Sequence, residues 1–225
     1  MKIAALLLLS IGSAMGSVSF NLANDFQNSV FSYGYTSTLG GTFNVYTVTD
    51  TSSHPGVVAL LAAGNYTLNP PYVARNTSGA PVDLGFYVLP TDVLHLHPGP
   101  TGQDTVVRFT APAAGTYAIA GLFGDIGGAT TDVHVLLNNV SQFNNNIGLG
   151  DVTPFNFLVT LSVGDQLDFA VGFGSNGTYF GDSTRLMGTI TSVPEPASLA
   201  LVALGFLTGL RLRRTVSKPA RITAR

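Results

Sequence analysis

The chain has 225 residues, of which only 10% are charged, with a formal net charge of −2 and no cysteine. This weak charge provides no basic field for a phosphate backbone, so nucleic acid is not an expected partner. Without cysteine the chain can form neither a disulfide framework nor thiolate metal sites, and its stability must come from an apolar core.

Residues 1–16 have the pattern of a secretory signal peptide. Lys2 supplies the positive charge, Ile3 to Ile11 form an apolar run, and Ala14-Met15-Gly16 ends the segment with small residues. We expect signal peptidase to cleave after Gly16. A membrane anchor is disfavoured, because the apolar run is shorter than the about 20 residues that a span requires.

From Phe20 to Thr191, short segments rich in Val, Phe, Tyr and Thr are separated by clusters of Gly, Pro, Asn and Asp. This pattern predicts an all-β domain over residues 17–191, as an antiparallel two-sheet β-sandwich or jelly roll of eight or nine strands. We expect strands near 42–49, 57–62, 84–89, 105–110, 116–123, 133–137, 153–161, 167–173 and 184–191. The segment Val57 to Ala63 also fits a short helix.

Strict alternation predicts which side chains face the core. The inward set is expected to include Val133, Val135, Leu137, Phe155, Phe157, Val159, Leu161, Tyr117, Ile119 and Phe123. The turn Val163-Gly164-Asp165 separates two alternating segments, so residues 153–173 are expected to form an antiparallel hairpin. Pro112 belongs in a connection, because proline cannot donate to a ladder.

Three histidines are candidates for metal binding. His95 and His97 lie two residues apart on an extended segment and can share a face, and His134 pairs with Asp132. Imidazoles are zinc ligands, but these residues lack a recognised zinc spacing. The favoured alternative is that His97 orders a loop through backbone hydrogen bonds and His134 lies on the outer face of its strand. No metal ligand or cofactor is therefore expected.

Oxygen-rich turns leave a structural calcium ion open as an alternative. Asp125, Asp132, Asp151 and Asp182 lie in or beside Gly- and Asn-rich loops, but none matches an EF-hand. A glycosidase needs a pair of carboxylates across a cleft, and nothing in the sequence marks such a pair. No serine lies in a Gly-x-Ser-x-Gly elbow. We therefore expect no catalytic residue and no enzyme.

Sugar binding in proteins commonly relies on exposed aromatic rings. The chain contains no tryptophan, so tyrosine is the available side chain with an apolar face and a polar tip. The candidates for exposed, ligand-binding rings are Tyr33, Tyr35, Tyr72 and Tyr179.

The C-terminal segment has three successive parts. Val193-Pro194-Glu195-Pro196 comes first, an apolar stretch from Ala197 to Leu210 follows, and the basic residues Arg211, Arg213 and Arg214 come last. The prolines prevent a helix from continuing out of the domain, whereas Ala, Leu and Phe favour a helix after them. Arginines that follow an apolar helix stay on the cytoplasmic side.

This arrangement resembles the PEP-CTERM sorting signal, here over residues 192–225. The resemblance implies recognition by exosortase, a membrane transpeptidase that acts at the Pro-Glu-Pro region, and a Gram-negative source. It also implies a short transmembrane helix that anchors the protein transiently, before the protein reaches the cell surface or extracellular matrix. An ordinary tail anchor would share the hydropathy but would not explain Pro-Glu-Pro.

The body also resembles the carbohydrate-binding-module-like sandwiches of PEP-CTERM proteins. The similarity is carried by Leu96-His97-Pro98-Gly99-Pro100, residues 107–112, residues 131–135 and the segment 163–172. It implies a non-catalytic protein that binds exopolysaccharide. Two alternatives stay open: a secreted metal-assisted glycan hydrolase that uses His95, His97 and His134, and a self-assembling structural adhesin with an exposed strand edge.

Overall fold

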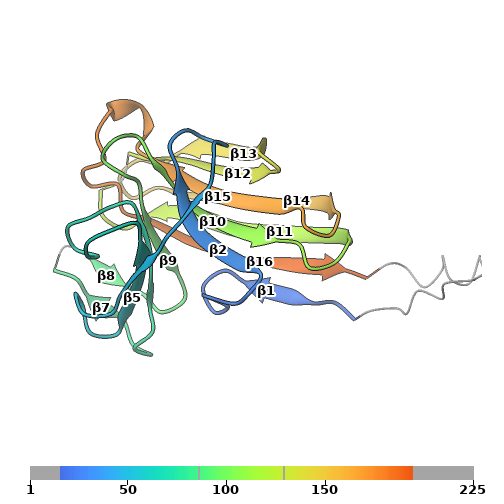
Figure 1. Cartoon of the computed structure of the whole chain (residues 1–225), viewed down its shortest axis with the longest axis horizontal. Coiled ribbons are helices and arrows are strands. Elements are labelled where there is room, and N and C mark those ends of the chain that lie inside the picture. The colour runs from blue at the N-terminus through green and yellow to red at the C-terminus, as the bar shows by residue number, and fades with distance from the viewer. Residues whose placement is uncertain (1–15, 86, 129, 195–225) are drawn as a thin grey trace, which may run out of the picture. The chain divides into compact units, whose positions relative to one another are not determined.

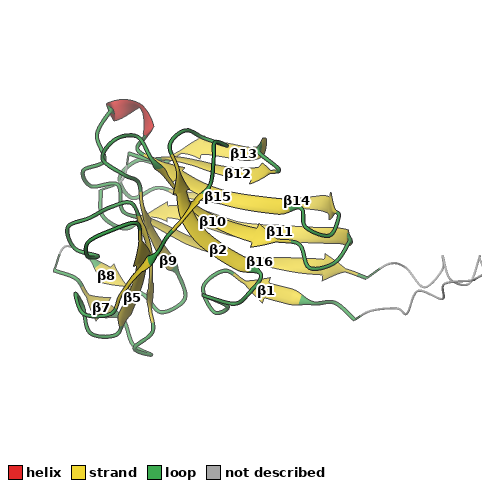
Figure 2. Cartoon of the chain, in the orientation of Figure 1, coloured by secondary structure: helices red, strands yellow, loops and turns green. Residues whose placement is uncertain are grey.

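The computed structural model describes residues 16–85, 87–128 and 130–194, and Val18–Ser192 forms one compact unit (Figure 1). Strands and loops make up almost all of it, with one short helix, η1 (Gly174–Asn176) (Figure 2). In chain order the strands are β1 (Ser19–Asn21), β2 (Phe31–Thr36), β3 (Asn44–Val45), β4 (Val48–Asp50), β5 (Val57–Leu61), β6 (Tyr72–Asn76), β7 (Val82–Asp83), β8 (Val88–Leu89), β9 (Leu94–His97), β10 (Asp104–Thr110), β11 (Gly115–Asp125), β12 (Asp132–Leu137), β13 (Val140–Asn146), β14 (Val152–Leu161), β15 (Gln166–Gly172) and β16 (Thr184–Val193).

The strands form two main sheets, which confirms the all-β, antiparallel two-sheet sandwich. Sheet A has eight strands in the order β14-β11-β16-β9-β6-β5-β4, with β1 also paired to β16. Sheet B has six strands in the order β13-β12-β15-β10-β2-β3, and β7 pairs with β8 separately. Strand β5 lies in the segment 57–63, for which a short helix was the alternative.

The core lies between the two sheets and is built from the alternating residues. Phe109, Phe123 and Phe169 are fully buried there, together with Ile119 and Val135. The predicted inward residues of β11 are confirmed, as are Val133 and Val135 of β12, while Leu137, Phe157 and Val159 are only partly buried against the core. Each strand buries its core face because alternate side chains point to opposite sides of the sheet.

The predicted hairpin over residues 153–173 is wrong. β14 pairs with β11 in sheet A, whereas β15 pairs with β10 and β12 in sheet B. The turn around Gly164, whose φ is 87°, therefore carries the chain from one sheet to the other. A sandwich arch and a hairpin bury the same alternating residues, so the alternation could not distinguish them.

The first and last strands of the body lie side by side. Ser19 of β1 pairs with Thr191 of β16, and the amide of Ser192 donates to the carbonyl of Val18 over 2.8 Å. The opposite end of β16 pairs with β9 through Thr184 and Leu96. The chain thus enters and leaves the sandwich at one end, while β9 and the loop 173–183 lie at the other end (Figure 1).

Several predicted features lie outside the described residues. They are residues 1–15 of the signal peptide, Glu195 and Pro196 of the sorting motif, the transmembrane helix, and the arginines Arg211, Arg213 and Arg214. In the part of the chain that the structure describes, no helix has the length and apolar character needed to cross a membrane.

Candidate ligand-binding site on sheet B

Four residues line up across the outer face of sheet B, and we call them the acidic row. Thr36 of β2 pairs with Asp104 of β10, and Gly172 of β15 is flanked by β10 and pairs with Asp132 of β12. Directly paired residues of neighbouring strands point to the same side of a sheet. The register therefore brings two carboxylates to either side of a glycine.

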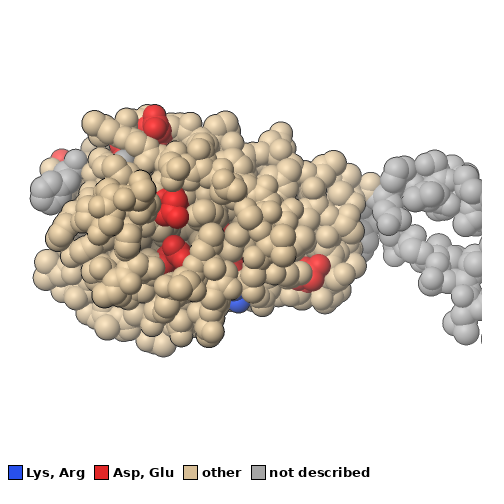
Figure 3. All heavy atoms as spheres, turned by 90° about the horizontal axis from the view of Figure 1, so that it is seen from above, with Lys and Arg blue, Asp and Glu red and all other residues tan. Residues whose placement is uncertain are grey.

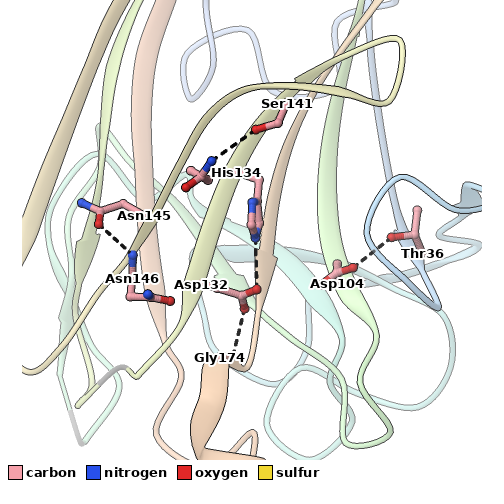
Figure 4. A network of polar contacts seen from close by, with 9 residues as sticks. Thr36, Asp104, Asp132, His134, Ser141, Asn145, Asn146 and Gly174 are labelled. Carbon is pink, nitrogen blue, oxygen red and sulfur yellow. Dashed lines mark hydrogen bonds and ion pairs between the residues drawn. The ribbon is translucent and has the colours of Figure 1, made fainter.

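The two carboxylates converge above Gly172. A Cβ atom built on this glycine would lie 2.4 Å from Oδ1 of Asp132 and 2.6 Å from Oδ1 of Asp104. Asp104 is only 7% exposed, and its Oδ2 accepts a long hydrogen bond of 3.4 Å from Oγ1 of Thr36 (Figure 4). Because glycine has no side chain, the space above Gly172 is open, and both Oδ1 atoms lie there.

The two carboxylates differ in their surroundings. Oδ2 of Asp132 accepts a hydrogen bond of 3.0 Å from Nε2 of His134, and Oδ1 accepts one of 2.9 Å from the amide of Gly174 (Figure 4). The hydrogen bond from His134 lowers the pKa of Asp132. Burial, followed by the charge of Asp132, raises the pKa of Asp104 to about 6.

A third carboxylate follows in the loop 173–183. Oδ1 of Asp182 accepts hydrogen bonds from the amide and the hydroxyl of Thr130, at 3.2 and 3.1 Å. Oδ2 of this fully buried side chain has no hydrogen-bond partner among the described residues. Burial raises the pKa of Asp182.

Charged side chains are sparse on the face shown in Figure 3, where isolated acidic groups stand among uncharged ones and some lie in a hollow.

The same loop presents an aromatic pair. The rings of Tyr179 and Phe180 stack with their centroids 4.4 Å apart, and Phe180 is 73% exposed. The ring of His97 lies edge-on to Tyr179 at 6.0 Å. Stacked rings with one exposed face are the geometry on which apolar faces of sugars pack.

The four tyrosine candidates differ in how far their rings are buried. The expectation that Tyr33 and Tyr72 present exposed rings is wrong, because both lie buried on strands β2 and β6. Tyr35 is half-buried and stacks on Tyr46, with centroids 6.1 Å apart. Tyr179 is half-buried as well, and it is the candidate that adjoins an exposed ring.

The histidines do not converge. His95 and His97 share the face of β9 that points away from the core between the sheets, and both are buried there, but His134 lies on β12 in sheet B. Nδ1 of His97 bonds the carbonyl of Pro98 over 2.9 Å, which confirms the loop-ordering role, and His134 lies on the outer face. Within the described ranges, no three His, Asp or Glu side chains gather as a metal-binding group.

His95 is instead enclosed by three tyrosines, Tyr66, Tyr72 and Tyr87, which we call the tyrosine cluster. The hydroxyls of Tyr66 and Tyr87 lie 2.7 and 2.8 Å from its Nδ1, and that of Tyr72 lies 3.4 Å from its Nε2. Burial holds the pKa of His95 well below its usual value of 6.5. This cluster is a polar part of the interior rather than an accessible site.

Two of the predicted calcium candidates order their own turns. Asp125 accepts hydrogen bonds from the amides of Gly127, Gly128 and Gly150, and Asp151 accepts one from Gly148.

Asp104 was not predicted as a site residue. In the sequence, Asp104 is marked only by its position directly before the predicted strand at 105–110. This position does not reveal which strands lie beside that strand in the sheet.

The chain combines a β-sandwich body with a C-terminal segment that carries a known sorting signal. Residues 192–214 match the PEP-CTERM protein-sorting motif, so this segment is the sorting signal that makes the chain an exosortase substrate sorted to the cell surface. The match begins at Ser192, inside strand β16. The chain matches no curated protein sequence.

The sandwich resembles solved structures only partially. A family 35 carbohydrate binding module from Clostridium thermocellum is 14% identical over 48% of this chain and 82% of the module, with a TM-score of 0.29. A second family 35 module, from an environmental isolate, is 24% identical over 42% and 73%, with a TM-score of 0.25. Rabbit GITRL is 16% identical over 40% and 73%, with a TM-score of 0.28. Similarities this low carry no argument about the ligand of this chain.

Proposed function

We propose that this protein is a non-catalytic cell-surface or extracellular-matrix protein of a Gram-negative bacterium, which binds exopolysaccharide through its sandwich. The match of residues 192–214 to the sorting motif carries the surface assignment. The proposal divides the chain into a signal peptide at 1–16, a sandwich domain at 17–191 and a sorting segment at 192–225. Signal peptidase and exosortase are the processing partners, and the C-terminal apolar helix holds the protein in the membrane before processing.

Processing is tested in the native host by following the size and location of the protein. Glu195→Ala should keep the full-length form in the membrane fraction, because the Pro-Glu-Pro region is the expected site of recognition. Pro219→Ala lies beyond the arginine cluster and serves as the matched control. Normal release of the Glu195→Ala protein would refute processing at this motif.

Glycan binding is supported by the loop 173–183. This loop carries the exposed ring of Phe180 stacked on Tyr179, and the amide of Gly174 at its start bonds Asp132 of the acidic row. An aromatic surface beside carboxylates offers an apolar face for a sugar ring and acceptors for its hydroxyl groups. The loop lies at the end of the sandwich opposite to Val18 and Ser192.

The binding test is a pull-down of the full-length chain with envelope polysaccharides. Phe180→Ala should lower retention strongly, because it removes the exposed ring, whereas Leu68→Ala removes an equally exposed apolar side chain elsewhere. Equal retention of both variants would contradict binding at this loop. No retention of the unsubstituted chain on any envelope polysaccharide would contradict glycan binding itself.

One observation favours self-assembly as a second function. β14 is an end strand of sheet A, its residues 152–161 carry no charge, and Leu158 is 68% exposed. Natural edge strands are usually blocked by charges or proline; residues 155–161, which follow Pro154, contain neither and are suited to pairing with another chain. Concentration-dependent assembly that Leu158→Lys abolishes would support this function, and a monomer at every concentration would contradict it.

A further inference from the structure

Among the described residues, neither carboxylate of the acidic row is paired with an arginine, and the basic group beside them is His134, which bonds Asp132. Of the chain's 12 acidic residues, all except Glu195 lie within residues 17–191, whereas Arg75, Arg108 and Arg185 are the basic residues of that range. Arg108 is bound to Asp168, and Arg75 donates to Asn24 and to the carbonyl of Thr91. The body therefore carries a large excess of negative charge, which is hidden in the net charge of the whole chain.

The carboxylate of Asp104 has few hydrogen-bond partners for its degree of burial. It is buried, yet no donor among the described residues bonds its Oδ1, and the contact of its Oδ2 with Thr36 is long at 3.4 Å. A buried carboxylate is costly unless it is paired or coordinates a cation. The free Oδ1 points to the space above Gly172, where Oδ1 of Asp132 also lies.

Gly172 keeps this space open. The residue lies in strand β15 and is absent from the glycines with positive φ, so its backbone does not require glycine. A Cβ atom there would instead collide with both Oδ1 atoms, at 2.4 and 2.6 Å. The two oxygens are thus separated by no more than these two distances together, and one ion with Ca–O distances of about 2.3–2.6 Å can bridge them.

We propose that Asp104 and Asp132 bind a divalent cation, with calcium as the favoured ion, above Gly172 on the outer face of sheet B. Calcium prefers hard oxygen ligands and accepts water in the remaining positions. The side chain of Asp132 is 35% exposed, so water reaches the site from this side. His134 and the amide of Gly174 fix the orientation of Asp132 (Figure 4). This site does not depend on the proposed glycan binding.

The test is a titration of the purified full-length chain, freed of metal with a chelator, with calcium chloride to about 10 mM, above the range typical of extracellular calcium sites. Binding is followed by calorimetry and by the melting temperature, with magnesium chloride in parallel. We expect a saturable rise in melting temperature with calcium. Absence of any saturable effect of either ion would overturn the proposal.

Variants separate binding from folding. Asp104→Asn should weaken calcium binding by on the order of tenfold or more, because one charged ligand is lost. It should not lower the melting temperature of the metal-free protein, because it also removes repulsion between two carboxylates. Asp92→Asn changes an exposed carboxylate and should leave binding intact. An equal calcium effect in Asp104→Asn and in the unsubstituted chain would refute the assignment.

Gly172→Ala provides a second variant that keeps both carboxylates. The added methyl group should push the two Oδ1 atoms apart and weaken calcium binding without changing the charge of the site. If it binds calcium as tightly as the unsubstituted chain, the convergence of the oxygens is not the basis of binding. A proton shared by the two carboxylates is the competing explanation, and it predicts no calcium effect at any pH at which the protein is folded.

Discussion

Arg108 and Asp168 form an ion pair with two parallel hydrogen bonds across β10 and β15. Nε of Arg108 donates to Oδ1 of Asp168 and Nη2 donates to Oδ2, and each donor–acceptor distance is 2.7 Å. Both side chains are largely buried, and the ring of Phe43 covers the guanidinium at 4.1 Å from its centroid. The loop that carries Phe43 thus removes the ion pair from water, although the pair lies on the outer face of its sheet.

Breaking this ion pair should be strongly destabilising. Asp168→Ala leaves an uncompensated buried guanidinium, and we expect a loss of about 3–5 kcal/mol in the free energy of unfolding. Urea denaturation of the full-length chain measures this loss. The double variant Arg108→Met with Asp168→Leu should recover most of it, and Asp92→Ala, on the surface, should stay within about 0.5 kcal/mol of the unsubstituted chain. A single variant as stable as the surface control would contradict the burial of the pair.

The core between the sheets should respond to truncation according to burial. Phe169→Ala removes a fully buried ring and should cost about 3–5 kcal/mol, and Val135→Ala should cost less because its side chain is smaller. Phe157→Ala, at a partly buried ring, should lie below Phe169→Ala. Phe180→Ala is the matched control, because its ring is exposed. Melting temperatures provide the ranking, and a shift for Phe180→Ala as large as for Phe169→Ala would be inconsistent with the described core.

The contribution of His95 to the stability of the protein should fall in mild acid. Above its ordinary pKa of 6.5, this side chain is neutral in both the folded and the unfolded chain. As the pH falls below 6.5, the unfolded chain takes up a proton that the folded chain refuses, since burial depresses the folded pKa. The free energy of unfolding should therefore decrease by up to about 1.4 kcal/mol for each pH unit from this residue.

The groups that face His95 do not reverse this direction. They are the hydroxyls of the tyrosine cluster, the ring of His97, which also lowers the pKa of His95, and Arg185, its register partner on β16. Urea denaturation between pH 7 and pH 5 measures the slope, and His95→Phe should reduce it relative to His54→Gln. Equal slopes in the two variants would assign the acid sensitivity to other groups.

Gly121 should be intolerant of a side chain. A Cβ atom at this position in β11 would lie 2.3 Å from the carbonyl oxygen of Met187, in the backbone of the neighbouring β16. Gly121→Ala should therefore cost about 1–3 kcal/mol through overpacking. Gly124→Ala, in the same strand, meets the movable side chain of Arg185 and should cost less. Denaturation midpoints compare the two, and the reverse order would count against the close approach of β11 and β16.

Local pattern was sufficient to predict the inward faces of several strands. Ile119, Phe123 and Val135 follow from a period of two residues, which depends only on neighbouring positions in the chain. The pairing of strands does not depend on neighbouring positions alone, and for this reason the hairpin at 153–173 was wrong. β13 was missed because its run of asparagines has the composition of a loop, although its backbone pairs with β12.

The candidate site was only partly predictable for the same reason. Asp132 was singled out from its loop, but Asp104 becomes its neighbour only through the register of β15 between them. Tyr33 and Tyr72 were selected by residue type, whereas their burial depends on the strand face and on the loops that cover it. Tyr66 and Tyr87 surround His95 from connecting segments whose paths no periodic pattern predicts.

The position of β16 gives the protein a mechanical property. This strand is bonded to β9 near Thr184 and to β1 near Thr191, and the sorting motif continues directly from its end. A force applied to the tail acts along β16, whereas the ladder bonds lie perpendicular to it. For a pull directed along β16, the bonds are therefore loaded together in shear and do not open one after another, so we expect this ladder to resist such a pull.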